Sequence, residues 1–551
     1  MTNLDYSKFT KKLYTALTNT SNNGKLLKVN TTTGSPDFID VPSGGGGGTT
    51  SVTGGNFPIL NLPATVSAAT VTTTLNNLAG QTVIVDKMYT VDGGVTVPAD
   101  TILLAMYEGC GFKLTGATNS LLFLSGGAVI NGLTLDGNRG NLTGTYGFGF
   151  ALARLISNST KLVQIIDCTL KNYGAGAIYG KNINGLYAFN NRIDGVYREA
   201  IMTQRSQNVW FENNKITNGP ATAQFHGKDS EVPTAISKMF RCINNVWDFS
   251  NITLDANETI LFIETWGGVE DVVIHGNRML APNTNNSNTV FGISLDYTKY
   301  ATVSSNYIDG GDAKILGYGL EAAGSEDCTY TDNTVNGYKG LAISISRSET
   351  RNIKVINNLI QNGTSSGWGC QVIDGAQDVL FQGNTFRDFG DYGIRFNGTG
   401  SGSQILNNRF YIRSQNFTGV GIFNQGAKRL VVRDNIAGPE FRPGVTAGTG
   451  YLNRFYNSDS GTYCTISSNN VSCQVPSTLA TGASSVAIMN YGSTGGNVIE
   501  NNVIQYSGIG IQTETSTTQP GNRIVANRSF GNVTTLVNSQ NSNDKKIDYL
   551  A

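Results

Sequence analysis

The sequence predicts an all-β solenoid, a fold in which short strands stack coil upon coil, and three observations support this prediction. Asparagine recurs at the end of short apolar runs every 23 to 35 residues between 191 and 527, and periods of about 20 to 50 residues are typical of solenoids. The runs alternate apolar and polar residues, which indicates strands. The composition, with 67 Gly and 14% charged residues among 551, suits short strands and turns.

The recurring asparagines mark the coils. Asparagine suits bends because it tolerates left-handed backbone, and stacked amides can hydrogen-bond from coil to coil. Residues 163–170 repeat the pattern of 209–216 without the asparagine, so coils precede the first marker. The count predicts about 15 coils in a parallel β-helix about 70 Å long. The markers are Asn191, Asn214, Asn245, Asn277, Asn306, Asn333, Asn358, Asn384, Asn408, Asn435, Asn470, Asn502 and Asn527.

A small head and a linker precede the solenoid. Residues 4–18 have the apolar spacing of a short amphipathic helix, and residues 25–42 are expected to form a small extended element. A head of residues 1–42 is too small for a robust core, so we expect it to be an attachment segment. The Gly-rich residues 43–56 indicate a flexible linker. The solenoid then spans 57–535, and residues 536–551 form a C-terminal tail.

Composition and charge argue against several classes of protein. Lys+Arg and Asp+Glu both total 39, so the sequence lacks the basic excess that a nucleic-acid partner favours. No apolar run is long enough to span a membrane, and no signal peptide is visible. Seven irregularly spaced Cys are expected to be buried free thiols. Neither a metal-ligand spacing nor a phosphate-binding loop is present, so we predict no metal and no cofactor.

Three acidic residues are the candidate catalytic groups. Counting back from a marker assigns strand residues to the inside or the outside of a coil, because successive side chains alternate. Asp296 and Glu321 lie ten and twelve residues before their markers, so both are expected to point outward. Glu264 lies thirteen residues before its marker and joins this face only if one residue is inserted. The Gly pair at 267–268 provides a place for that insertion.

Carboxyl groups on successive coils meet the requirement of glycoside hydrolysis for an acid and a base or nucleophile. Neighbouring coils would separate them by about 5 Å and alternate coils by about 10 Å. Their repulsion would raise the pKa of one carboxyl, which keeps it protonated. Outward acids are often only solvated charges, but aromatic neighbours provide platforms for sugar rings. The candidate catalytic residues are Glu264, Asp296 and Glu321, and the candidate substrate-binding residues are Trp266, Tyr297, Lys299, Asp374, Arg395 and His226.

The strand-like segments 80–91, 95–104, 109–114 and 129–138 resemble the opening of right-handed parallel β-helix proteins of the pectate lyase superfamily. The sequence looks most like bacteriophage tailspikes that degrade bacterial surface polysaccharides, over residues 57–535. The head joined by a Gly run also resembles the virion-attachment segment of such tailspikes. Unlike many of them, this sequence shows no distinct C-terminal trimerisation domain.

The resemblance implies a homotrimer on the phage tail, bound to the tail or baseplate through its N-terminus. Such a protein would hydrolyse glycosidic bonds of a capsule or O-antigen. A lyase acting on a uronate-containing polymer is an alternative, with Tyr297 and Lys299 as base and cation. A non-catalytic glycan-binding tail fibre or adhesin is another. Longer steps between markers predict loops that cluster around 220–290, a candidate binding region, and around 439–482, a second one or a subunit contact.

Overall fold

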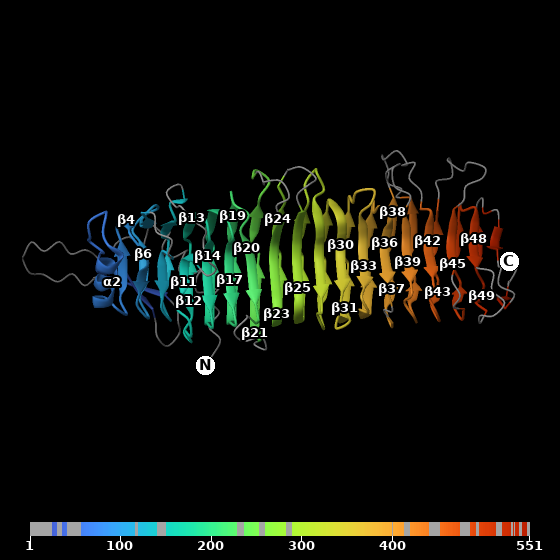
Figure 1. Ribbon diagram of the computed structural model, residues 1–551, viewed down its shortest axis with the longest axis horizontal. Helices are drawn as coiled ribbons and strands as arrows, with labels where there is room; N and C mark the ends of the chain where they lie inside the picture. The colour runs from blue at the N-terminus through green and yellow to red at the C-terminus, as the bar shows by residue number, and fades with distance from the viewer. Residues whose placement is uncertain are drawn as a thin grey trace, which may run out of the picture.

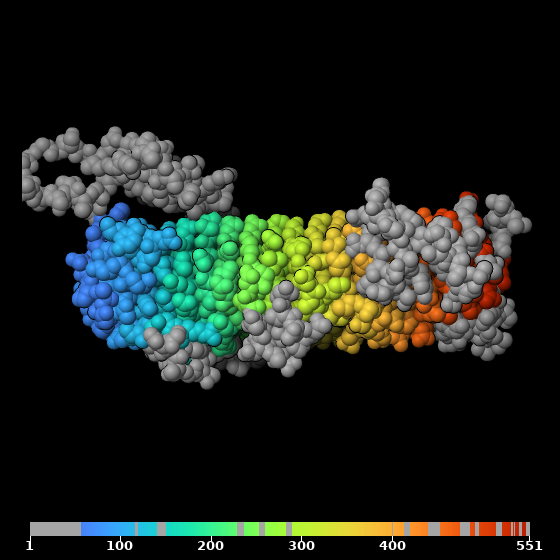
Figure 2. Space-filling view, turned by 90° about the horizontal axis from the view of Figure 1, so that it is seen from above, coloured from blue at the N-terminus to red at the C-terminus, as the bar shows by residue number. Residues whose placement is uncertain are grey.

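The computed structural model describes the chain in segments. They are residues 25–29, 36–40, 57–115, 120–139, 150–228, 236–252, 259–282, 289–398, 401–412, 419–439, 452–473, 485–491, 495–513, 521–530, 533, 535–538 and 543–547. From residue 57 onward, the described residues form a parallel β-helix whose coils follow one another in chain order along a rod (Figures 1 and 2).

Each coil contributes strands to three parallel sheets that run the length of the rod. The asparagine sheet contains strands that precede a marker, such as β18 (Gln207–Glu212). The short-strand sheet contains strands that follow a marker, such as β19 (Lys215–Thr217). The third sheet, called the site sheet here, contains strands such as β20 (Thr222–His226), and the next coil begins with β21 (Ser237–Ile243).

The number of coils is close to the predicted count of about 15. In the described part of the chain, the short-strand sheet has 17 strands, from β4 (Met88–Val91) to β50 (Arg528–Phe530). At about 4.8 Å per strand the rod is roughly 80 Å long. Strands pair in register, so that Val209 of β18 lies opposite Phe240 of β21. Side chains at equal positions therefore stack from coil to coil.

The site sheet carries the candidate residues, and two of its strands continue around the bend into the asparagine sheet. These long strands are β23 (Thr259–His275) and β25 (Thr289–Ser304). The other site-sheet strands from the first third of the rod onward are β14 (Gly176–Lys181), β17 (Glu199–Gln204), β20, β27 (Leu316–Ala323), β30 (Tyr338–Ser346), β33 (Trp368–Ile373), β36 (Tyr392–Asn397), β39 (Val420–Gln425), β42 (Arg454–Asp459), β45 (Val486–Tyr491) and β48 (Ile509–Thr513).

Helix α2 (Ala68–Asn77) lies at the N-terminal end of the rod (Figure 1). It begins after Ser67, whose hydroxyl accepts a hydrogen bond from the Thr70 N–H at 3.1 Å, a typical N-cap. Its buried face packs on β5 (Val95–Val97) and covers apolar side chains of the first coils. Helix α2 was not predicted from the sequence, although its buried residues Ala68, Val71 and Leu75 have helical spacing. No helix in the described residues is long and apolar enough to cross a membrane.

The marker asparagines form a continuous buried ladder of amides. Asn333 is typical: its Oδ1 accepts from the backbone N–H and the Nδ2 of Asn306, at 3.0 and 2.9 Å. Its own Nδ2 donates to Asn358 Oδ1 and to the Val303 carbonyl, each at 2.9 Å. At the N-terminal end, the Cys168 N–H donates to the Asn191 side chain at 2.9 Å. The alignment of 163–170 with the later coils is therefore confirmed.

One predicted marker is wrong by one residue. The ladder passes from Asn435 through Asn469 to Asn502. Asn469 is fully buried, whereas Asn470 is exposed at the start of β44 (Asn470–Ser472). The sequence offers two adjacent asparagines there, and only the backbone decides which amide points inward.

Apolar side chains fill the inside of the coils in one continuous core. Large members such as Trp247 and Phe211 are fully buried, with ring centroids 6.1 Å apart. All seven Cys are buried and free, as predicted. The core thus consists of rows of stacked side chains, which suits a fold whose coils contact mainly their neighbours.

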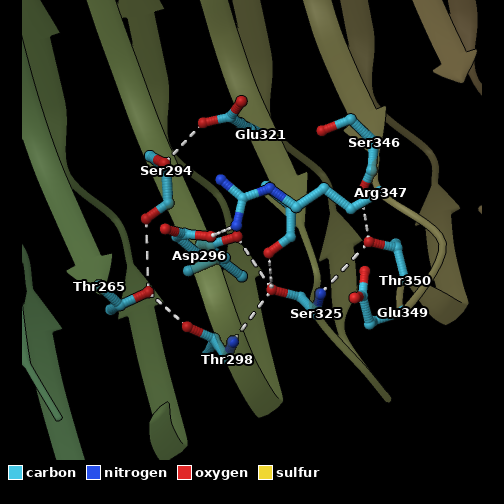
Figure 3. A network of polar contacts seen from close by, with 12 residues as sticks. Thr265, Ser294, Asp296, Thr298, Glu321, Ser325, Ser346, Arg347, Glu349 and Thr350 are labelled. Atoms are coloured by element: carbon cyan, nitrogen blue, oxygen red, sulfur yellow. Dashed lines mark hydrogen bonds and ion pairs between the residues drawn. The ribbon is translucent and has the colours of Figure 1, made fainter. Parts of the chain in front are cut away.

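A second inward stack, of Ser and Thr, lines the bend between the site sheet and the asparagine sheet (Figure 3). The hydroxyls of Thr265 and Thr298 are 2.6 Å apart. Ser325 Oγ accepts from the Thr298 N–H at 3.1 Å, and Thr350 Oγ1 accepts from the Ser325 N–H at 3.3 Å. These bonds link the bends of four successive coils and hold the outward residues next to them.

The structure bears on some of the predictions for the two ends of the chain. Strands β1 (Lys25–Val29) and β2 (Pro36–Asp40) pair antiparallel within the expected extended element. The predicted helix at 4–18 and the linker at 43–56 lie outside the described residues. Strands β51 (Thr535–Asn538) and β52 (Lys545–Ile547) pair with the preceding coil, so the β-helix continues past residue 535, where the sequence predicted its end.

Candidate functional site

The bends after the site-sheet strands share one backbone feature, a residue with left-handed φ. Such angles favour Gly and Asn because a Cβ is strained there, so larger side chains at these bends are unusual. In six successive coils the bend residue has φ between 51° and 116°; these residues are Gly267, Tyr297, Gly324, Arg347, Asp374 and Gly398.

The bends provide a common reference for the outward side chains. The residues three positions before the bends lie opposite one another and form what we call the carboxylate row. One position before the bend, Trp266 lies opposite Asp296. Three successive strands, β23, β25 and β27, therefore present the three predicted acids on one face. The carboxylate row contains Glu264, Ser294, Glu321, Ser344, Gln371 and Arg395.

Glu264 joins this face through one extra residue in its coil. The register of β23 against β25 shifts between Trp266 and Val269, so that β23 has one residue more in this stretch. Gly267 and Gly268 lie there, with φ of 73° and 93°. The insertion that the sequence analysis required at the Gly pair is present.

Asp374 does not share the position of Asp296, although both precede a marker by ten residues. Asp296 lies in β25, one residue before the bend, whereas Asp374 is itself the bend residue. The distance from bend to marker is nine residues after Tyr297, ten after Asp374 and eleven after Arg347. Counting back from the marker therefore assigns equal positions only where the bends have equal lengths.

Asp296 and Glu321 each have a fixed partner (Figure 3). The Ser294 hydroxyl donates to Glu321 Oε2 at 2.6 Å. Arg347 reaches back from the end of β30, and its Nη1 lies 2.7 Å from Asp296 Oδ1. Although it points outward, Asp296 is only 8% exposed. The face is thus covered where these side chains meet.

The pKa of Asp296 is raised to about 6. Burial is the main cause, because it penalises the charged form. The nearby carboxylates of Glu321 and Glu264 raise the pKa further, while Arg347 and Lys228 lower it. A carboxyl with this pKa is partly protonated near neutral pH, which is a property of a general acid.

Glu264 lies beside an imidazole and an indole. The buried His226 Nε2 lies 3.6 Å from Glu264 Oε2, beyond hydrogen-bond length. The His226 ring contacts the Trp266 ring edge to face, with centroids 5.3 Å apart. His226 was expected within the loops around 220–290, but it lies in strand β20, opposite Trp266 of the adjacent strand.

Two cations lie over the aromatic rings at the bend. Lys228 Nζ is 5.4 Å from the Trp266 ring centroid and 5.5 Å from that of Tyr297. The Arg347 guanidinium is 4.8 Å from the Tyr297 ring. Lys228 and Arg347 were not among the site residues predicted from the sequence. Arg347 shares the bend position of Tyr297, so an alignment of the bends would have found it.

An aromatic row runs beside the carboxylate row. Phe291 and Tyr318 stack at 4.2 Å, and the row continues through Leu341 to Trp368. Burial, together with the carboxylate of Glu321, raises the pKa of Tyr318 above its ordinary range. Its hydroxyl therefore stays neutral next to that carboxylate.

The remaining candidates lie away from the acids. Lys299 lies beyond the bend, in the asparagine sheet, where its Nζ pairs with Glu326 at 2.9 Å. Arg395 belongs to the carboxylate row but lies three strands beyond Glu321. Among the described residues, no group of three or more His, Cys, Asp or Glu side chains is arranged to hold a metal ion. The arrangement provides proton donors and acceptors next to rings and cations.

The comparisons with known proteins concern the fold. A family model described as "Right handed beta helix region" matches residues 291–459. The chain is similar to the N-terminal fragment of bacteriophage Phi29 gene product 12, with 11% identity, a TM-score of 0.41, and 86% of this chain and 93% of that chain covered. A comparison with curated proteins finds no match.

Two further solved structures are similar to the chain. One is a mutant tailspike protein of E. coli bacteriophage HK620 in complex with a pentasaccharide, with 12% identity, a TM-score of 0.41, and 83% and 73% of the two chains covered. The other is DFA-IIIase from Arthrobacter chlorophenolicus A6, with 13% identity, a TM-score of 0.35, and 65% and 88% covered. The protein is a right-handed parallel β-helix.

Proposed function

We propose that the protein is a glycoside hydrolase that cleaves a polysaccharide, with Asp296 as the general acid. The observation that supports this most directly is a buried carboxyl whose pKa is raised to about 6 between two further carboxylates. Glycosidic cleavage needs one protonated and one ionised carboxyl at close range. Trp266 and the aromatic row offer platforms for sugar rings on either side.

In the proposed reaction, Asp296 donates its proton to the glycosidic oxygen as the bond to the anomeric carbon breaks. Glu321, held by the Ser294 hydroxyl, takes a proton from the attacking water. The two acids lie in adjacent strands and are offset by two positions, a diagonal of about 7–8 Å. This is a spacing of the strands; carboxyl groups held at a similar separation would leave room for the water and give inversion of configuration. Glu264 lies in β23, on the other side of Asp296 from Glu321, and the repulsion of its negative charge helps to keep Asp296 protonated.

The proposed substrate is a bacterial surface polysaccharide, either a capsule or an O-antigen. We place the protein on the tail of a phage, as a homotrimer attached through residues 1–42 to the tail or baseplate. The support is the order of a small head, a Gly-rich segment and a β-helix, which resembles phage tailspikes. The long outward face of the site sheet suits an extended polymer.

A polysaccharide lyase is the second candidate, and the cations at the bend favour it. β-Elimination needs a cation to neutralise a uronate carboxylate and a base to take the proton at C5. Lys228 and Arg347 lie where they would meet such a carboxylate, on either side of Tyr297. In that reaction Tyr297 would take the proton at C5, the leaving oxygen would take a proton from Asp296 as its bond to C4 breaks, and the product would carry a C4–C5 double bond. A non-catalytic glycan-binding fibre is the third candidate.

The test is to incubate the protein with a panel of capsular and O-antigen polysaccharides and to size the products by gel filtration. We expect cleavage with new reducing ends and no gain in ultraviolet absorbance, whereas a lyase would produce an absorbing unsaturated sugar. Glu264→Gln, Asp296→Asn and Glu321→Gln should lose cleavage but still bind the polymer. Glu326→Gln, an acid beyond the bend, is the matched control. If all three site variants degrade the polymer, the proposed site is wrong.

A further inference from the structure

Three aromatic rings surround the guanidinium of Arg395 on the outward face of β33, β36 and β39. Its carbon Cζ lies 4.5 Å from the Trp368 ring centroid, 5.4 Å from that of Tyr392 and 5.8 Å from that of Phe423. Trp368 contacts Tyr392 edge to face at 5.4 Å, and Tyr392 stacks on Phe423 at 5.1 Å. We call these four residues the arginine recess.

The charge of Arg395 has no acidic partner among the described residues. Its Nη2 donates a hydrogen bond to Gln425 Oε1 at 3.1 Å, and its Nε is buried without a hydrogen-bond partner among the described residues. Asp391, the acid near the recess, instead accepts from Trp368 Nε1 at 3.2 Å. By contrast, Arg347 on the same face pairs with Asp296.

Ring faces compensate a half-buried cation only in part, because a guanidinium presents five N–H donors that prefer carboxylate or phosphate oxygens. Gln425 uses one of the donors of Arg395. A buried Nε without an acceptor is costly, and a bidentate anion would supply the missing acceptors and the missing charge. The aromatic rings beside it would accommodate the apolar face of a sugar.

The arginine recess lies in line with the proposed catalytic acids. Arg395 belongs to the carboxylate row. Paired strands of the site sheet connect Glu321 to it through Ser344 and Gln371. Three strand spacings amount to about 14 Å. A polysaccharide that lies along the row would therefore reach the recess a few sugar rings away from the bond being cleaved.

We propose that the arginine recess is a subsite for a carboxylate-bearing sugar, so that the substrate is an acidic polysaccharide cut within the chain. Arg395 binds the carboxylate, and Trp368 and Tyr392 contact the sugar ring. The position of the subsite relative to Asp296 rests on the proposed function. The preference of the recess for an anionic sugar does not require cleavage.

The first experiment measures binding without cleavage. The full-length Asp296→Asn protein is titrated with D-glucuronate, N-acetylneuraminate, D-glucose and inorganic phosphate, and the fluorescence of Trp368 is followed, with Trp368→Phe identifying its signal. The two acidic sugars should bind more tightly than glucose and phosphate. Arg395→Gln should weaken them about 10- to 100-fold, as expected for a lost charge-assisted hydrogen bond. Arg409→Gln, at the start of β38 (Arg409–Ile412) in the short-strand sheet, should bind like the parent.

The binding results decide the proposal. Equal binding of glucuronate and glucose overturns it, and so does binding that Arg395→Gln leaves unchanged. Phosphate binding as tight as glucuronate binding indicates a general anion site and also overturns the assignment to a sugar. No detectable binding of any probe overturns it as well.

The second experiment uses a polymer that the wild-type protein degrades. Arg395→Gln should raise KM about 10-fold or more and leave kcat nearly unchanged, because Arg395 lies away from the reacting bond. Reduction of the polymer's carboxyl groups should have the same effect on the wild type and none on the variant. If no polymer is degraded, the proposed function fails while the binding result stands.

Discussion

Replacement of Asp296 by Asn should remove activity and at the same time stabilise the protein. Asn has nearly the same shape as the protonated acid and stays neutral at every pH. The side chain is 12% exposed and lies within 2.7 Å of Arg347. Loss of the proton donor should lower the rate of cleavage about 10²- to 10⁴-fold.

The change in stability follows from the pKa. The pKa of Asp296 is about 6 in the folded protein, against 3.8 for an ordinary Asp. A raised pKa means that the protonated form stabilises the fold, fully below about pH 4, and that this contribution is lost as the pH rises through about 6. About two pKa units at about 1.4 kcal/mol each correspond to about 3 kcal/mol. Asp296→Asn should therefore be more stable than the wild type by up to about 3 kcal/mol near pH 8, and nearly equal near pH 4.

The assay is urea or thermal unfolding of both proteins at the two pH values, next to cleavage at pH 6. Glu349→Gln, an exposed acid two coils further along the rod, is the control and should change neither quantity. The reasoning would be refuted by a variant that is less stable at pH 8, or by a stability difference that does not depend on pH. A variant that cleaves normally would refute the role of Asp296 as the acid.

Two further predictions concern the ladder and the site. Asn469→Ala removes the acceptor for the Asn435 N–H and the donor to the Val432 carbonyl, so it should destabilise the protein by about 2–6 kcal/mol. Replacement of the adjacent, exposed Asn470 by Ala is the control and should cost less than about 1 kcal/mol. Equal unfolding midpoints of the two variants would contradict the assignment of Asn469 to the amide ladder. Arg347→Gln removes a cation that lowers the pKa of Asp296, so the alkaline limb of the pH–rate profile should move above its wild-type position near pH 6. Arg351→Gln, whose partner is Glu326, is the control and should leave the limb unchanged. An alkaline limb that does not move in Arg347→Gln would refute the electrostatic coupling of Arg347 to Asp296.

The repeat and the fold were predictable from the sequence for a local reason. A strand alternates inward and outward residues with period two, and a buried amide at a bend needs a partner in the next coil. Both requirements recur in each coil, so they produce a periodic pattern in the sequence. The same pattern predicted the outward direction of Asp296 and Glu321, and the Gly pair indicated the extra residue that aligns Glu264.

The misassigned positions also have a physical cause. Asn470 was chosen from two adjacent asparagines, of which only Asn469 points inward. Asp374 was placed by counting along the chain, and counting works only while the bends keep one length. The bends differ by up to two residues from coil to coil. The left-handed residue at each bend is a better reference, but only the backbone reveals where it lies.

The sequence by itself determined the solenoid, the buried thiols and the face that carries the acids, because these follow from patterns within single coils. Only the tertiary structure decided which side chains meet across coils. The approach of Arg347 to Asp296, of His226 to Glu264 and of three rings to Arg395 depends on the lengths of the bends that separate them. Those lengths set the register between coils, and residues far apart in the chain become neighbours only through that register.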